Sequence, residues 1–169
     1  MRKLLDGIYN SAAALAALFM LGLLLMVLLS IVSRQLHFYV PGVDAYAGYL
    51  MAASGFLAMA HTLKRGEHIR VTLLINALRG RWKKGMELFA LGLAIFLALL
   101  LAFYSCKLAW QSHLFNDMST GSDATPLWLP QIAMAYGAVI FAVAFIDEAL
   151  LEILGRRVHR ASGEALRNE

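Results

Sequence analysis

The sequence predicts an all-α integral membrane protein with four transmembrane helices and an amphipathic interfacial helix on the cytoplasmic side. Hydrophobic residues make up 60% of the 169 residues and charged residues only 15%, whereas soluble domains average roughly 45–50% and about 25%. The hydrophobic residues form four long runs, and most basic residues gather on one side of them. This excess of apolar residues is too large for the core of one globular domain of this length.

The four runs cover residues 8–33, 43–63, 88–106 and 127–146. A helix needs about 20 apolar residues to cross the hydrocarbon core of a bilayer, so each run can span a membrane. The first run exceeds the roughly 7–15 apolar residues of a cleavable signal peptide, and we expect it to be retained. Since nothing repeats internally, residues 1–169 are predicted to form a single membrane domain.

The basic residues predict the orientation of these spans. All Lys and Arg residues except Arg34 and Lys107 lie before the first run, between the second and third, or after the fourth. Cytoplasmic loops carry the excess of basic residues, so both termini and the 64–87 loop are predicted to face the cytoplasm. The net charge of +4 therefore reflects cations that flank the membrane, and it does not indicate nucleic-acid binding.

Residues 70–84 are predicted to form the interfacial helix. Their apolar side chains recur at helical spacing, and polar or basic residues occupy the opposite face. The apolar face consists of Val71, Leu74, Ile75, Leu78 and Trp82. The segment is too short and too charged to span, so this face is expected to lie in the headgroup boundary or against a partner.

The predicted spans contain few groups that could carry chemistry, and we expect no catalytic residue, cofactor or metal. Ionisable residues deep in a membrane usually mark a function, but the first and third runs have none at mid-depth. The single cysteine, Cys106, excludes an intramolecular disulfide and a cysteine metal cluster. A haem anchor needs two axial ligands at similar depth, whereas His61 and His113 lie on opposite predicted sides.

The second run carries a stripe of small residues. Gly48, Ala52 and Gly55 fall on one helical face, and small residues let transmembrane helices approach closely. Packing within the chain and packing on a partner both explain the stripe.

Three segments of the sequence resemble the small membrane subunit, of the DctQ type, of tripartite ATP-independent periplasmic (TRAP) transporters. The matching residues are Arg34, Pro41 and Asp44 around the second span, Arg65, Gly66 and His68 after it, and Thr125, Pro126, Trp128 and Pro130 before the fourth span. The family often has Glu where this chain has Asp44, a difference that keeps the charge.

The resemblance implies a scaffold subunit in the bacterial inner membrane. In such systems a periplasmic binding protein captures a substrate, commonly an organic acid, and a larger membrane subunit carries it inward, driven by sodium. The chain is therefore not expected to be an enzyme. Its expected partners are the periplasmic binding protein and the larger membrane subunit. Two alternatives stay open, namely a haem or quinone membrane anchor and a free-standing small exporter.

Physical roles follow for some of the matching residues. Gly66 is expected to allow a turn at the membrane surface. Arg65 and His68 either hold that turn or are ordinary positive-inside charges. On the periplasmic side, Asp117, Asp123 and residues 125–130 are expected either to contact the binding protein or to form a plain solvated loop.

Overall fold

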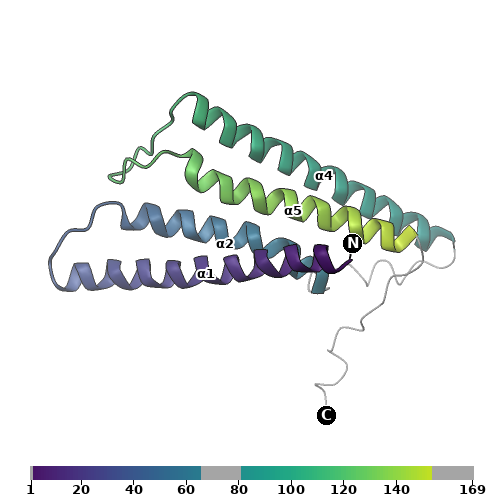
Figure 1. The fold of residues 1–169 in the computed structure, drawn as a ribbon, viewed down its shortest axis with the longest axis horizontal. Coiled ribbons are helices and arrows are strands. Elements are labelled where there is room, and N and C mark those ends of the chain that lie inside the picture. The colour runs from purple at the N-terminus through teal and green to yellow at the C-terminus, as the bar shows by residue number, and fades with distance from the viewer. Residues whose placement is uncertain (1, 66–80, 154–169) are drawn as a thin grey trace, which may run out of the picture.

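The computed structural model describes residues 2–65 and 81–153 of the chain. Within these ranges it contains four α-helices, which Figure 1 shows. They are α1 (Arg2–Gln35), α2 (Val43–Arg65), α4 (Arg81–Leu114) and α5 (Trp128–Ile153). The predicted all-α class is therefore confirmed for the described residues.

The helices form two antiparallel pairs that lie side by side in a row (Figure 1). α1 packs along α2, α2 packs along α5, and α5 packs along α4, while α1 meets α5 over a small area. Each pair is closed by a loop at the same end of the molecule, formed by residues 36–42 and 115–127, and we call this end the outer end and the opposite end the inner end. The two inner helices of the row, α2 and α5, thus hold the two pairs together.

Three of the described helices are long and apolar enough to cross a membrane, within Leu5–Gln35, Leu88–Leu114 and Trp128–Leu151. α2 does not belong to this group, because it carries Asp44, His61, Lys64 and Arg65 as well as several small residues. A helix that packs between α1 and α5 meets less lipid than an outer helix, so it needs less apolar surface. The fourth predicted span is therefore a proposal based on this position in the row.

The helices extend beyond the predicted spans. α4 begins at Arg81 and ends at Leu114, whereas the prediction was 88–106. Hydropathy falls at polar residues such as Lys107, but a helix continues past the hydrocarbon because its backbone groups still need hydrogen bonds. Residues 81–84, predicted as the end of the interfacial helix, form the start of α4, and residues 70–80 lie outside the described residues.

The core of the row consists mainly of alanines. The buried cluster includes Ala12 and Ala16 of α1, Ala60 of α2, Ala98 and Ala102 of α4, and Ala138, Ala142 and Ala144 of α5, with Tyr9, Leu57, Leu63, Ile140 and Phe141 between them. Small side chains allow close helix contacts, which stabilise helix association in lipid.

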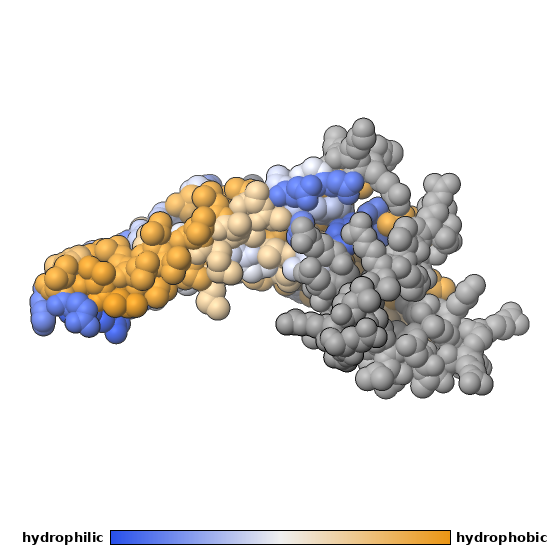
Figure 2. All heavy atoms as spheres, turned by 90° about the horizontal axis from the view of Figure 1, so that it is seen from below, coloured by the Kyte–Doolittle hydropathy of each residue, from blue (hydrophilic) through white to orange (hydrophobic). Residues whose placement is uncertain are grey.

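Large apolar side chains cover the outside instead. Figure 2 shows a continuous hydrophobic band on the α1 side of the molecule, with hydrophilic residues at its outer end. On α1 alone, Leu18, Leu21 and Leu25 are each at least 60% exposed. A soluble protein rarely exposes a patch of this kind, so the band faces either lipid or a partner.

Candidate functional site

The first helix of each pair ends in a cap that turns the chain back. His37 follows α1 with a φ of 54°, and Asn116 follows α4 with a φ of 52°. After α1, the Phe38 amide donates to the Ser33 carbonyl at 3.1 Å. This bond across five residues, with a left-handed residue inside it, is a Schellman cap, and the same pattern follows α4. Both outer loops thus begin in a fixed direction.

The 115–127 loop folds into a small hairpin. The Ser119 amide donates to the Thr125 carbonyl at 2.8 Å, and the Leu127 amide donates to the Asp117 carbonyl at 3.0 Å. One antiparallel bridge lies between these two bonds. Some of the backbone donors and acceptors of the loop therefore bond to one another, which gives the loop a defined shape.

Three hydrogen bonds fix this hairpin to the start of α2. They join the Tyr49 hydroxyl to the Asp123 carboxylate (3.1 Å), the Gly42 amide to the Ser122 hydroxyl (2.9 Å), and the Thr125 hydroxyl to the Tyr46 hydroxyl (3.0 Å). The two tyrosine rings also contact each other edge to face, with centroids 6.1 Å apart. The loop before α5 and the outer end of α2 therefore form one unit, which we call the outer clasp.

Asp123 is the acceptor at the centre of the outer clasp. Its carboxylate accepts hydrogen bonds from the Ser119 hydroxyl at 2.7 Å and from the Tyr49 hydroxyl. The bond from Ser119, followed by those from Thr125 and Tyr49, lowers the pKa of the Asp123 carboxyl below its usual value. The Asp123 carboxylate, which was expected either to contact a partner or to lie in a solvated loop, is thus engaged within the chain.

Gly42 is required by the outer clasp on two grounds. Its φ of +78° lies in the left-handed region that other residues rarely adopt. A Cβ atom at this position would also stand 2.6 Å from the Cβ of Asp123. Any side chain here would displace the loop from α2.

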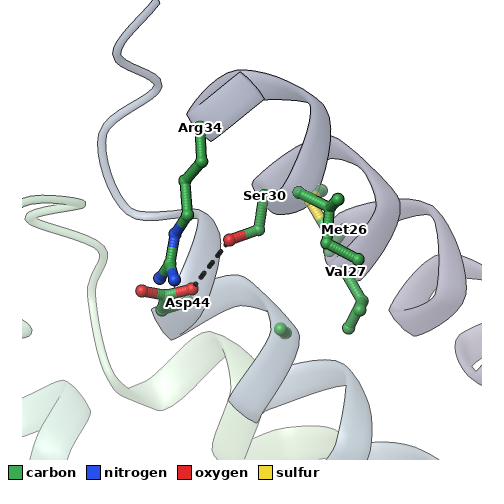
Figure 3. Close-up of a pocket in the computed structure, with 7 residues that line it drawn as sticks. Met26, Val27, Ser30, Arg34 and Asp44 are labelled. Carbon is green, nitrogen blue, oxygen red and sulfur yellow. Dashed lines mark hydrogen bonds between the residues drawn. The ribbon is translucent and has the colours of Figure 1, made fainter. Parts of the chain in front are cut away.

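A pocket lies beside the outer clasp, between the end of α1 and the start of α2. Figure 3 shows Arg34 extending toward the carboxylate of Asp44, which also accepts a hydrogen bond from the Ser30 hydroxyl at 3.4 Å. The cavity measures about 180 Å³, and its remaining lining residues are Met26, Val27, Ile31 and Ala47. Two residues that the resemblance brought together, Arg34 and Asp44, therefore share one pocket.

The small-residue stripe on α2 faces out of the chain. Gly48, Ala52 and Gly55 are all exposed, and a Cβ atom built on either glycine would meet no atom within 4 Å among the described residues. The close helix contact uses a different glycine. A Cβ on Gly137 of α5 would stand 2.6 Å from the backbone carbon of Phe56. Packing among the described helices thus does not explain the stripe.

The inner ends of the helices meet at an ion pair. Lys64 of α2 pairs with Asp147 of α5, and both side chains are about four-fifths buried. The Lys64 ammonium also lies 5.3 Å from the ring centroid of Tyr9 on α1, close enough for a cation–π contact. Three helices therefore converge on one charged group, which the sequence analysis had counted only as a cytoplasmic cation.

Histidines and carboxylates are scattered along the described helices. Within residues 2–65 and 81–153, no three His, Cys, Asp or Glu side chains are grouped to hold a metal ion. His61 lies near the inner end of α2, whereas His113 lies at the outer end of α4 and contacts the Trp128 ring at a centroid distance of 5.2 Å. These two histidines cannot ligate one haem.

Comparison with protein families gives a match over most of the chain. The model of the family described as tripartite ATP-independent periplasmic transporters, DctQ component, matches residues 23–156. The chain belongs to the DctQ family. This result confirms the resemblance seen in the sequence, and it identifies the chain as the small component of a TRAP transporter. A comparison with curated proteins gave no match.

The residues that carried the DctQ resemblance fall at two ends of the molecule. At the outer end, Pro41 lies exposed in the 36–42 loop, while Thr125 belongs to the outer clasp. Trp128 and Pro130 stand in the first turn of α5, where proline costs no helical hydrogen bond. Pro126 precedes this turn, and its carbonyl accepts the Leu129 amide at 3.2 Å.

At the inner end, Arg65 is the last residue of α2. Gly66 and His68 lie outside the described residues, as do Val71, Leu74, Ile75 and Leu78 of the predicted apolar face, while Trp82 stands in the first turn of α4. The roles predicted for the DctQ signature at this end stay predictions.

The sequence analysis missed the partners of Lys64 and Tyr49. Helical spacing held a signal for the first, because Leu57, Ala60 and Lys64 follow one face of α2. A basic residue on the same helical face as buried apolar residues indicates a partly buried charge, and such a charge usually pairs with an acidic side chain. No local signal existed for Tyr49 and Asp123, which are 74 residues apart.

Proposed function

We propose that this DctQ component is a non-catalytic scaffold subunit. It supports sodium-coupled uptake of an organic acid by a larger membrane subunit and a periplasmic binding protein. The family match carries this proposal. The exposed stripe on α2 supports it, because small residues offer a close-packing surface to another membrane protein.

The stripe gives the proposal a geometric test. Ala52 is exposed at the centre of the stripe, so Ala52→Phe leaves the packing of the isolated chain unchanged and obstructs a helix that docks on α2. We expect the variant to melt like the wild type and to co-purify poorly with the large subunit. Ala14→Phe is the matched control, since Ala14 is exposed on α1 opposite the buried residues Ala12 and Ala16.

Reconstitution tests the scaffold function itself. Proteoliposomes that contain the large subunit, this chain and the binding protein should take up substrate in a sodium-dependent way. Omission of this chain should abolish uptake. Full uptake without it would refute the scaffold function, whereas normal assembly of Ala52→Phe would refute only the docking face on α2.

We further propose that all four described helices span the inner membrane and that both termini face the cytoplasm. The outer clasp then lies in the periplasm. After replacement of Cys106 by serine, a cysteine introduced at Ser122 should react with an impermeant thiol reagent in intact cells, and one introduced at Arg79 should not. The opposite labelling pattern would overturn the orientation.

A further inference from the structure

The pocket between α1 and α2 has a polar end and an apolar end. Arg34 stands one residue before the end of α1, and Asp44 is the second residue of α2. Met26 and Val27 lie about two helical turns deeper on α1, or roughly 10–12 Å along its axis. The pocket thus changes from charged to apolar along the direction in which a lipid changes from headgroup to acyl chain.

The two charges at the polar end are of opposite sign. Arg34 and Asp44 are both exposed and line the same cavity. Figure 3 shows the Arg34 guanidinium directed toward the Asp44 carboxylate, so the two charges lie side by side at the polar end of the pocket. Because both are exposed, a ligand that carries a negative and a positive group can contact both charges at once.

The pocket opens into a wider groove toward the outer clasp. The groove has a volume of about 560 Å³ and shares Ser30, Arg34 and Asp44 with the pocket. Its far side is formed by residues of the 36–42 loop and by Gly121 and Ser122. The charged groups thus line both a groove large enough for a headgroup and a cavity of about 180 Å³ that reaches the apolar residues Met26 and Val27.

We propose that this site binds a phospholipid with a zwitterionic headgroup that carries a phosphate and an ammonium. The Arg34 guanidinium binds the phosphate, since its planar fork matches phosphate oxygens. The Asp44 carboxylate binds the ammonium, and one acyl chain lies along Met26, Val27 and Ile31. One cation and one anion in the site match one anion and one cation in the ligand.

Lipid binding to the full chain, purified in detergent, tests the site. The probes are phosphatidylethanolamine, phosphatidylglycerol with the same acyl chains, and soluble glycerophosphoethanolamine, and the readout is the dissociation constant from native mass spectrometry. The wild type should bind phosphatidylethanolamine about tenfold or more tightly than either other probe, because phosphatidylglycerol lacks the ammonium and the soluble headgroup lacks the chains.

Variants separate the three contacts. Arg34→Gln should weaken the binding of phosphatidylethanolamine by about tenfold. Asp44→Asn should abolish the preference over phosphatidylglycerol. Ala47→Phe, which fills the apolar end, should weaken the binding of both lipids. Lys107→Gln at the outer end of α4 and Ala14→Phe on α1 are the matched controls and should bind like the wild type.

Three results would overturn the proposal. Equal binding of the two lipids by the wild type would remove the role of Asp44. Equal binding by Arg34→Gln and Lys107→Gln would remove the phosphate contact. Tight binding of the soluble headgroup would show that the site takes a free zwitterion, and that the apolar cavity holds no acyl chain.

Discussion

The contact at Gly137 joins the two helix pairs, and its strength can be measured. A Cβ atom on this residue would stand 2.6 Å from the carbon, 2.7 Å from the oxygen of Phe56 and 2.9 Å from the nitrogen of Leu57. All three are backbone atoms, which cannot rotate away as a side chain does. In Gly137→Ala, α2 and α5 must therefore separate by about 0.8 Å, the difference between 2.6 Å and the 3.4 Å of ordinary contact.

Overpacking of this kind costs typically about 1–3 kcal/mol. Alanine also favours a helix by about 1 kcal/mol relative to glycine, so the variant needs a control that shares this gain. Gly55→Ala on α2 is suitable, since a Cβ there meets nothing within 4 Å in the described part of the chain. The difference between the two variants then isolates the packing cost.

Thermal unfolding of the purified chain in detergent measures this difference. For a chain of this size, about 1–3 kcal/mol corresponds to a melting temperature roughly 2–12 °C lower for Gly137→Ala than for Gly55→Ala. Equal melting temperatures would mean that α2 and α5 do not touch at this point. The row of helices would then need a different arrangement at its centre.

Further predictions concern the ends of the row. Lys64→Met should destabilise the chain by about 1–3 kcal/mol in denaturant unfolding, because it leaves the partly buried Asp147 unpaired, and adding Asp147→Leu should restore much of the loss. An unchanged single variant would exclude the ion pair. The lowered pKa of Asp123 means that its stabilising contribution is complete above the unfolded pKa and is lost as pH falls through the folded pKa. The melting temperature of the wild type should therefore drop more steeply on acidification than that of Asp123→Asn, and parallel curves would contradict this. If the predicted interfacial helix anchors the scaffold, Leu74→Asp should reduce uptake by the assembled transporter while the polar-face control Asn76→Asp does not, and equal uptake would indicate a plain loop.

The sequence predicted the existence of the helices better than their ends. Hydropathy located a span around residues 88–106, but α4 runs on past Lys107 because backbone hydrogen bonding continues where the apolar run stops. It also marked Gly48 as a residue that packs either within the chain or on a partner, and the structure exposes Gly48 and buries Gly137. Small residues favour close contact on any helix, and only the arrangement in space decides which of them meet a neighbour.

Pairs of residues far apart in the chain were the least predictable part of the candidate site. Arg34 and Asp44, two residues of the DctQ resemblance, line one pocket, because a short loop joins their helices. The bond from Tyr49 to Asp123 depends on how one helix pair lies on the other, which no local pattern encodes. The same holds for Lys64 and Asp147, whose separation is 83 residues.

The seam between α2 and α5 is attached in three places along its length. Hydrogen bonds of the outer clasp hold one end, the Gly137 contact holds the middle, and Lys64 with Asp147 holds the other end. A force that pulls the two helix pairs apart must break all three attachments together. Rotation of one helix pair relative to the other about this seam meets less resistance. α1 touches α5 only over a small area, and α4 packs on α5 alone among the described helices. The two helix pairs are therefore held firmly against separation, whereas rotation of one pair against the other about the seam is opposed by fewer contacts.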